Sequence, residues 1–198
     1  ALLLQEGILR FELSWTAVKK NICAVIFVSK TPDHIVLPPT SCLIQARLGL
    51  DIETLCYDSM AACYGFIGGM ELAGLIAKQH DADVLLLTGD TNSRIVSAAD
   101  SSAVMFGDGG AATIIGSVKD VSIDLHIRNN GAIADVATVK AGGFRYPTTE
   151  ENLVFHTDQY GNSRNDCHMR MHGLDMMNFV LNDASALIKE TMDFYGGA

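Results

Sequence analysis

The stretch YDSMAACYGFIGGMELAGLIA, from Tyr57 to Ala77, decides how the rest of the chain is arranged. Small residues lead up to a cysteine, Cys63, and a small, apolar segment with the character of a helix follows it. The amino end of a helix favours an anion, so a cysteine placed there holds more of the reactive thiolate. The same pattern also fits an unreactive core cysteine, because free cysteines are among the most buried residues.

The helical segment after Cys63 is unusually rich in glycine, at positions 65, 68, 69 and 74. Each glycine inside a helix costs helix propensity. We therefore expect another element to pack very closely against this helix, as a sheet does against a buried helix.

Continuous apolar runs on both sides of this stretch predict strands that are buried on both faces. The clearest are residues 22–28 and 84–89, and residues 55–60 predict a third strand that leads into Cys63. A helix is expected over residues 40–48, between the strands over 22–28 and 55–60. The alternation of strands and helices predicts an α/β fold with mostly parallel strands.

Two of the predicted helices carry further signals. The helix over 40–48 has Thr40 or Ser41 as its cap and Gly49 as its stop. Near the end of the chain, apolar residues recur at helical spacing over residues 174–194 and predict a long helix.

The remaining segments give weaker patterns. Residues 1–10 resemble the tail of a helix, and residues 148–170 are polar and predict a surface excursion. Residues 106–116 read as a glycine-rich turn and then a strand, which favours close backbone packing over a phosphate loop, where a helix would follow. Residues 122–128 alternate and predict an exposed antiparallel strand.

The composition limits the partners and the compartment. With 14 basic and 23 acidic residues the net charge is −9, which argues against nucleic acid as a main partner. The five cysteines show no framework spacing, so we expect reduced thiols and a cytoplasmic protein. No apolar run is long enough for a membrane span, and we expect no membrane partner. Both ends of the sequence have the character of cuts through a larger protein.

Residues 58–66, DSMAACYGF, resemble the active-site segment of ketoacyl-acyl-carrier-protein synthase III, in the thiolase superfamily. Several other segments resemble that family in the same order, over about residues 20–195. They are residues 27–33 (FVSKTPD), 39–50 (PTSCLIQARLGL), 106–112 (FGDGGAA), 141–147 (AGGFRYP) and 171–173 (MHG). The resemblance favours Cys63 as a nucleophile over a core cysteine.

The resemblance implies a thiolase-like α/β fold with layered α-β-α-β-α architecture, here only partly present. Residues 1–120 would form the first half with Cys63, without its first strand, and residues 121–198 a connecting segment and the start of the second half. The implied activity begins with acyl transfer from acyl-CoA to Cys63. A decarboxylative Claisen condensation with malonyl-acyl carrier protein follows, and no cofactor is needed. No segment here matches the family's decarboxylating His and Asn.

Two departures from the family concern substrate binding. Ser101 stands where many members carry an arginine that holds the CoA adenine, so the primer could instead arrive on a carrier protein. Leu37 stands where some members carry a phenylalanine that reaches into the partner subunit's acyl pocket. The acidic carrier protein would dock on a local basic patch, for which Arg145, Arg164 and Arg170 are candidates.

The other cysteines and histidines carry no chemistry in this interpretation. Cys23, Cys42 and Cys56 lie in apolar segments and are expected to be core thiols. The sequence Cys167-His168 with His172 lacks the paired spacing of a zinc site, so we expect surface residues and no metal.

Three functions remain open at this point. The first is a homodimeric condensing enzyme of the synthase III type, in fatty acid biosynthesis. The second is an acyltransferase or specialised-pathway condensing relative that uses the same Cys63 thioester. The third is a non-catalytic subunit that supports a catalytic partner. In the first, the strand over 55–60 would pair with its symmetry mate, since nothing guards it as an edge.

Overall fold

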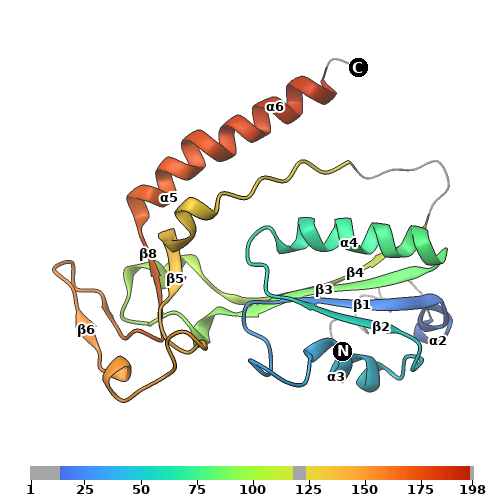
Figure 1. The fold of residues 1–198 in the computed structure, drawn as a ribbon, viewed down its shortest axis with the longest axis horizontal. Coiled ribbons are helices and arrows are strands. Elements are labelled where there is room, and N and C mark those ends of the chain that lie inside the picture. Colours follow the sequence, from blue (N-terminus) through green and yellow to red (C-terminus); the bar gives the residue numbers. More distant parts are fainter. Residues whose placement is uncertain (1–13, 118–123, 197–198) are drawn as a thin grey trace. The chain divides into compact units, whose positions relative to one another are not determined.

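The computed structural model describes residues 14–117 and 124–196, and its contacts divide the chain into two units. The described residues of the first unit are 14–91, 108–117 and 124–125, and those of the second unit are 92–107 and 126–196. Figure 1 shows the helices and strands of both units. This division follows contacts within the chain. The predicted division near residue 120 follows the halves of a family fold and stays a prediction.

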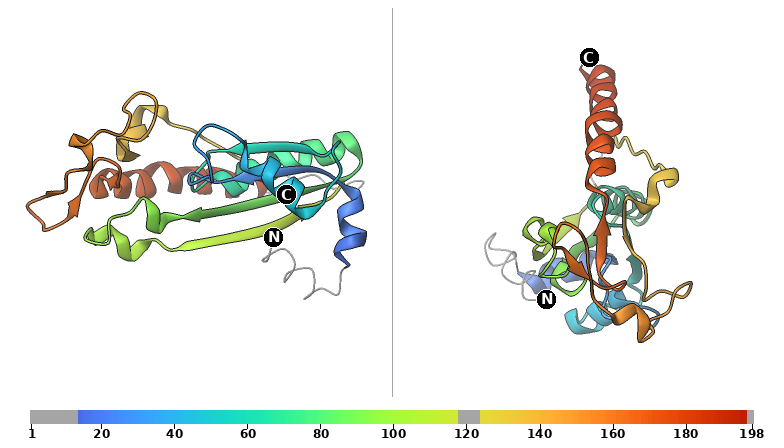
Figure 2. Two further views of the ribbon diagram at one scale, coloured as in Figure 1. Left: turned by 90° about the horizontal axis from the view of Figure 1, so that it is seen from below. Right: turned by 90° about the vertical axis from the view of Figure 1, so that its left-hand side faces the viewer.

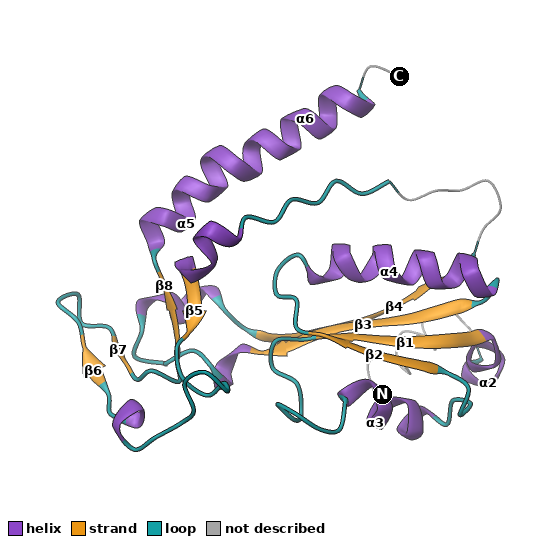
Figure 3. Ribbon diagram, viewed as in Figure 1, coloured by secondary structure: helices purple, strands orange, loops and turns teal. Residues whose placement is uncertain are grey.

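The described part of the first unit contains a four-stranded sheet in the order β2-β1-β3-β4 (Figure 3). Its strands are β1 (Ile22–Val28), β2 (Leu55–Ser59), β3 (Asp83–Thr91) and β4 (Asp108–Ile115). Both β2 and β3 run parallel to β1, and β4 runs antiparallel to β3. The predicted strands over residues 22–28, 55–60 and 84–89 and the mostly parallel sheet are therefore confirmed.

Helices cover both faces of this sheet, which explains why its central strands are apolar throughout. On one face, α3 (Thr40–Leu48) shares a core with Val25 and Leu85. On the opposite face, α4 (Gly65–His80) contributes Ala73 and Ala77 to a core with alternate residues of the same strands. Figure 2 shows α3 and α4 on opposite sides of the sheet. The short helices α2 (Trp15–Val18) and η1 (Lys19–Asn21) precede β1.

The glycines of α4 allow it to approach the sheet closely. A methyl group at Gly69 would lie only 2.7 Å from Leu86 Cδ1, and one at Gly65 would overlap Val28. These two positions confirm the predicted close packing. At Gly74 the described chain leaves the space within 4 Å of such a methyl group open, so the prediction does not extend to that position.

The first turn of α3 is capped from outside the helix. Asp58 of β2 accepts hydrogen bonds from the backbone N–H groups of Thr40 (2.7 Å) and Ser41 (2.8 Å). Thr40 and Ser41 are the first helical residues, so the prediction that one of them supplies the cap is wrong. Gly49 ends the helix with φ +61°, as predicted.

Asp90 ties the ends of β1 and β3 together. Its carboxylate accepts hydrogen bonds from Ser29 Oγ (3.1 Å), Lys30 N (2.9 Å) and Thr31 Oγ1 (3.2 Å), and it pairs with Lys30 Nζ at 2.8 Å. Burial acts to raise the pKa of Asp90, but the hydrogen bonds and charge of Lys30 outweigh it and hold this pKa below its ordinary value.

The second unit contains short strands and one long helix. The strand β5 (Ala137–Val139) pairs with β8 (Met169–Met171), and β6 (His156–Thr157) pairs with β7 (Ser163–Arg164). The unit also contains short 3₁₀ segments, η2 (Asn92–Arg94), η3 (Ser101–Met105), η4 (Gly131–Val136) and η5 (Glu151–Leu153). The backbone of η4 is interrupted at Ile133.

The predicted helix over residues 174–194 is confirmed, with one irregular turn (Figure 2). It consists of α5 (Gly173–Phe179), a π-helical turn η6 (Val180–Ala184) and α6 (Ser185–Tyr195). The Ser185 hydroxyl donates a hydrogen bond to the carbonyl oxygen of Val180, in the π-helical turn, at 2.9 Å.

Two sequence predictions differ from the structure. The predicted strand over 122–128 is wrong for residues 124–128, which have no regular structure and no paired strand among the described residues. Cys42 is exposed, while Cys23 and Cys56 are half-buried, so Cys42 is not the core thiol we expected. The helix tail predicted over residues 1–10 lies outside the described part of the chain.

Candidate functional site

Cys63 lies in the tight turn that joins β2 to α4, two residues before the helix begins. Both sides of the turn are anchored. On the β2 side, the Ser29 N–H donates to the carbonyl oxygen of Ser59 (2.9 Å). On the α4 side, the Gly65 N–H donates to the carbonyl oxygen of Ala62 (2.8 Å). The glycine contacts of α4 hold the other side against the sheet. The rigid elements on either side therefore determine where the thiol is presented.

The surroundings of Cys63 suit a nucleophile better than a core residue. Its side chain is exposed in this structure, whereas a core cysteine would be buried. Within residues 14–117 and 124–196, the Cys63 N–H donates no hydrogen bond. A thiol beside an open backbone donor at a helix start can attack a thioester and offer that donor to the resulting oxyanion.

Leu37 and Ser101 lie in different units. Leu37 is 74% exposed in the loop between β1 and α3, next to the exposed side chains of Ile35 and Val36. Ser101 begins η3 in the second unit, where its backbone N–H donates to Asn162 Oδ1 at 2.8 Å. The structure thus places Leu37 in the same unit as Cys63, and Ser101 in the other.

Asp100, next to Ser101, is the centre of a polar network in the second unit. It accepts hydrogen bonds from the N–H (2.9 Å) and hydroxyl (2.7 Å) of Ser102, and it forms an ion pair with Arg164. Burial acts to raise the pKa of Asp100, but these hydrogen bonds and the charge of Arg164 outweigh it, so this pKa is lowered. Arg164 also binds Asp158 at 2.8 Å.

The three predicted docking arginines therefore differ in availability. Arg164 is 19% exposed and neutralised by two carboxylates, which makes it a poor contact for a partner. Arg145 and Arg170 are exposed.

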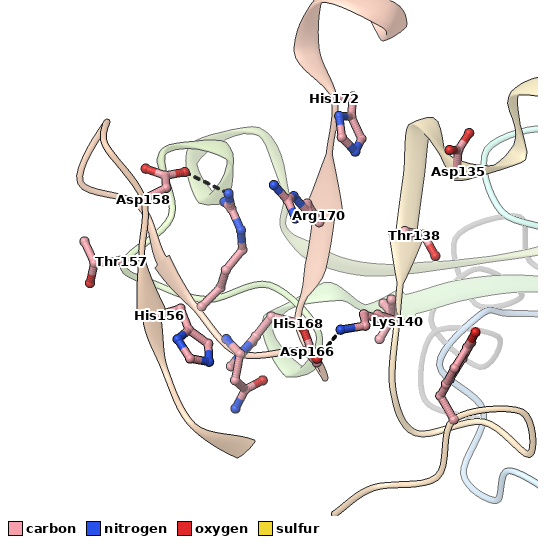
Figure 4. Close-up of a pocket in the computed structure, with 14 residues that line it drawn as sticks. Asp135, Thr138, Lys140, His156, Thr157, Asp158, Asp166, His168, Arg170 and His172 are labelled. Carbon is pink, nitrogen blue, oxygen red and sulfur yellow. Dashed lines mark hydrogen bonds and ion pairs between the residues drawn. The ribbon is translucent and has the colours of Figure 1, made fainter. Parts of the chain in front are cut away.

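A cavity of about 630 Å³ opens in the second unit, and no sequence pattern predicted it (Figure 4). It collects side chains from the strands β5 to β8 and the loops between them. Acidic and basic groups line it together, and Lys140 pairs with Asp166 at 2.7 Å inside it. Among its lining residues are His156, His168, His172, Lys140, Arg164, Arg170, Asp135, Asp158 and Asp166.

This cavity is separate from the residues singled out by sequence. None of Cys63, Leu37 and Ser101 is among its lining residues. His168 is occupied locally, because its Nδ1 accepts from Asn165 N–H at 3.3 Å and its ring lies 5.3 Å from that of Phe155. In the described residues, no three metal-binding side chains come together. No helix described here is both long and apolar enough to cross a membrane.

Comparisons with known proteins give a consistent result. Residues 57–131, which include Cys63, match the family described as 3-oxoacyl-[acyl-carrier-protein (ACP)] synthase III. A beta-ketoacyl-[acyl-carrier-protein] synthase III from Campylobacter concisus is 38% identical over 138 residues, 68% of this chain and 41% of the relative. One from Clostridium botulinum is 33% identical over 167 residues, 83% of this chain and 48% of the relative.

Solved structures agree with the sequence relatives. A crystal structure of a 3-oxoacyl-(acyl-carrier-protein) synthase III has a TM-score of 0.83 at 30% identity, and the match covers 93% of this chain and 59% of the other. A 3-oxoacyl-(acyl-carrier protein) synthase from Burkholderia xenovorans has a TM-score of 0.71 at 30% identity, covering 89% and 49%. The chain spans about half the length of the curated relatives it matches, 41% and 48% of those above.

Proposed function

Because the chain belongs to the 3-oxoacyl-[acyl-carrier-protein] synthase III family over the part that it shares with these relatives, we propose that it serves the family's acyl transfer, with Cys63 as the acyl carrier. The observation that supports this most directly is the exposed Cys63 thiol at the start of α4, inside the segment that matches the family. Neither the specialised acyltransferase nor the non-catalytic subunit has a comparable observation in its favour.

In the proposed first step, the Cys63 thiolate attacks the carbonyl carbon of an acyl-CoA thioester. The oxyanion that forms would accept a hydrogen bond from the Cys63 N–H, a backbone donor beside the thiol. The C–S bond to CoA then breaks, CoA leaves as a thiol, and the acyl group stays on Cys63 as a new thioester. A thiolate suits both attack and departure.

In the second step, malonyl-acyl carrier protein loses CO₂ and its α-carbon attacks the acyl group on Cys63. This forms the new carbon–carbon bond and releases the cysteine. The resemblance assigns the groups that drive decarboxylation to a His and an Asn that match no segment of this chain. The acylation step is therefore the one that tests the residues described here.

Two residues are proposed to set the substrate. We assign Leu37 to the acyl pocket, where a side chain smaller than phenylalanine leaves room for a longer or branched acyl group. We assign Ser101 to the CoA-binding region, where the missing arginine weakens the hold on the adenine. Exposure of Leu37 and the free surface at Ser101 are compatible with contact to a ligand or a second subunit.

The carrier protein is proposed to dock near Arg145 and Arg170, in the cytoplasm. Both arginines are exposed, and a local basic site is required because this chain is itself acidic, at −9. Reversing both charges to glutamate should slow association with the carrier protein and flatten its salt dependence, whereas Lys78→Glu on α4 should not. Association kinetics that are unchanged in the double variant would remove this patch as the docking site.

A two-fold dimer is proposed to form along β2. Within the described sheet β2 pairs only with β1, so its other edge is open. Exposed Tyr57 (43%) and Met60 (71%) lie along or just beyond this edge. Tyr57→Lys should block strand pairing along β2. The control Ile52→Lys, at a loop residue that is 90% exposed, should leave it intact. Sedimentation measures both, and an active monomer at micromolar concentration would rule the arrangement out.

Intact-protein mass spectrometry with acetyl-CoA tests the central assignment. We expect one acetyl adduct, which hydroxylamine removes because it is a thioester. Cys63→Ala should lose the adduct, whereas Cys42→Ala should retain it, although Cys42 is also an exposed cysteine. An adduct that persists in Cys63→Ala refutes the assignment.

A further inference from the structure

The thiols of Cys42 and Cys56 meet where α3 packs against β2. Cys42 belongs to the first turn of α3, and Cys56 is the second residue of β2. The Cys42 thiol lies near enough to the Cys56 thiol to act on it electrostatically. They come from separate elements, and neither has a part in the acyl transfer proposed above.

Asp58 fixes the geometry of this contact. Alternate residues of a strand point to the same face, so Cys56 and Asp58 project from the same side of β2. Asp58 holds the N–H groups of Thr40 and Ser41 at 2.7 and 2.8 Å, and Cys42 is the next residue of the helix. The face of β2 therefore meets the first turn of α3 at two neighbouring points, a carboxylate cap and a pair of thiols.

The two thiols differ in their access to solvent. Cys42 is exposed, whereas Cys56 is half-buried and its Sγ lies 3.6 Å from Thr54 O. Burial, and after it the neighbouring Cys42 thiol, raise the pKa of Cys56 to about 11. Because the thiolate is the reactive form, a reagent from solvent should react with Cys42 first.

We propose that Cys42 and Cys56 form a reversible disulfide, with a low-molecular-weight disulfide such as oxidised glutathione as the oxidant. The Cys42 thiolate attacks one sulfur of the reagent, breaks its S–S bond and releases one thiol, which takes up the proton that Cys42 lost. Cys56 then gives up its proton and attacks Cys42 Sγ, which releases the second thiol. Two protein thiols are oxidised and one reagent disulfide is reduced to two thiols.

The order of attack has a specific consequence. With Cys56 removed, the reaction should stop at a mixed disulfide on Cys42, because the thiol that displaces the reagent is then missing. With Cys42 removed, half-buried Cys56 should react slowly. The completed disulfide closes a loop of about 15 residues and ties α3 to the edge strand, so it should also restrain the unfolded chain.

Incubation of the protein with oxidised glutathione, followed by peptide mapping without reduction, tests the proposal. We expect a cross-linked peptide pair that contains Cys42 and Cys56 and disappears on treatment with dithiothreitol. Cys56→Ser should give a glutathione adduct on Cys42, and the control Cys167→Ser should still form the cross-link. The oxidised protein should melt about 5 °C higher than the reduced protein.

Two results would overturn the proposal. One is accumulation of glutathione on Cys42 of the unmutated protein without conversion to the cross-link. The other is a set of cross-links in which Cys42 pairs with Cys23 or Cys63 as often as with Cys56, since that pattern reports unfolding. Acylation of Cys63 is scored separately, so failure of this proposal and failure of the proposed function are distinguishable.

Discussion

Replacing Gly69 by alanine should destabilise the fold, whereas the same replacement at Gly74 should stabilise it. Inside a helix, alanine is favoured over glycine by about 1 kcal/mol. At Gly74, no described atom outside the local helix lies within 4 Å of the added methyl group, so the full gain is expected. At Gly69 the methyl group would lie 2.7 Å from Leu86 Cδ1 and 3.3 Å from Val28 Cγ2.

These contacts decide the sign at Gly69. Carbon atoms pack best at about 3.5–4.0 Å, so the new methyl group would overlap Leu86. Leu86 is 1% exposed and Val28 is 4% exposed, which leaves both side chains little room to move aside. Overpacking of this kind costs about 1–3 kcal/mol, against a propensity gain of about 1 kcal/mol. The two variants should therefore differ by about 2 kcal/mol in the free energy of unfolding.

Urea unfolding followed by far-ultraviolet circular dichroism measures this difference. We expect the midpoint to fall for Gly69→Ala and to rise for Gly74→Ala, with unchanged slopes, because the surface exposed on unfolding stays the same. Equal stabilisation of both variants would refute the reasoning, since it would show that α4 is not held against β3 as closely as described. That result would also weaken the argument that the sheet positions Cys63.

Three further predictions rest on single residues. Asp58→Ala removes the cap of α3 and should lower the free energy of unfolding by about 1–2 kcal/mol in thermal denaturation. Asp33→Ala, at an exposed residue of the preceding loop, is the control. The pKa of Asp90 is lowered by Lys30, so its contribution to stability should be complete above about pH 4 and lost as the pH falls through its pKa in the folded state. Asp90→Asn should flatten this acid dependence of the melting temperature, and an unchanged acid limb would contradict the ion pair's role. Ser101→Arg should raise the rate of Cys63 acylation at low acyl-CoA concentration by about tenfold, the value of one charge-assisted hydrogen bond. An equal gain in rate with a primer bound to the carrier protein would contradict this prediction, because that primer carries no CoA adenine.

The central strands were predictable because their burial leaves a direct trace in the sequence. Residues 22–28 and 84–89 are apolar throughout, and β1 and β3 have helices or cores on both faces. The cap of α3 was not predictable in this way. It comes from Asp58, 18 positions beyond Thr40, and it exists only because β2 pairs with β1.

Alternation alone proved insufficient for residues 124–128. A strand needs a partner for its backbone groups, and a sequence pattern does not supply one. The candidate functional residues were likewise predictable only where a local sequence pattern marks them. Cys63 could be found from a local motif, but the cavity draws on strands of two or three residues, which are too short to leave a periodic signal.

The π-helical turn from Val180 to Ala184 is the structural equivalent of a one-residue insertion in the long helix. Each α-helical residue turns the chain by about 100°, whereas the wide π-helical turn takes up one additional residue without adding that rotation. The apolar residues of α6, among them Leu187, Ile188 and Met192, therefore point in directions that the spacing within α5 would not give. Deleting a single codon within this turn should therefore restore a regular helix and leave the direction of the apolar face of α6 unchanged.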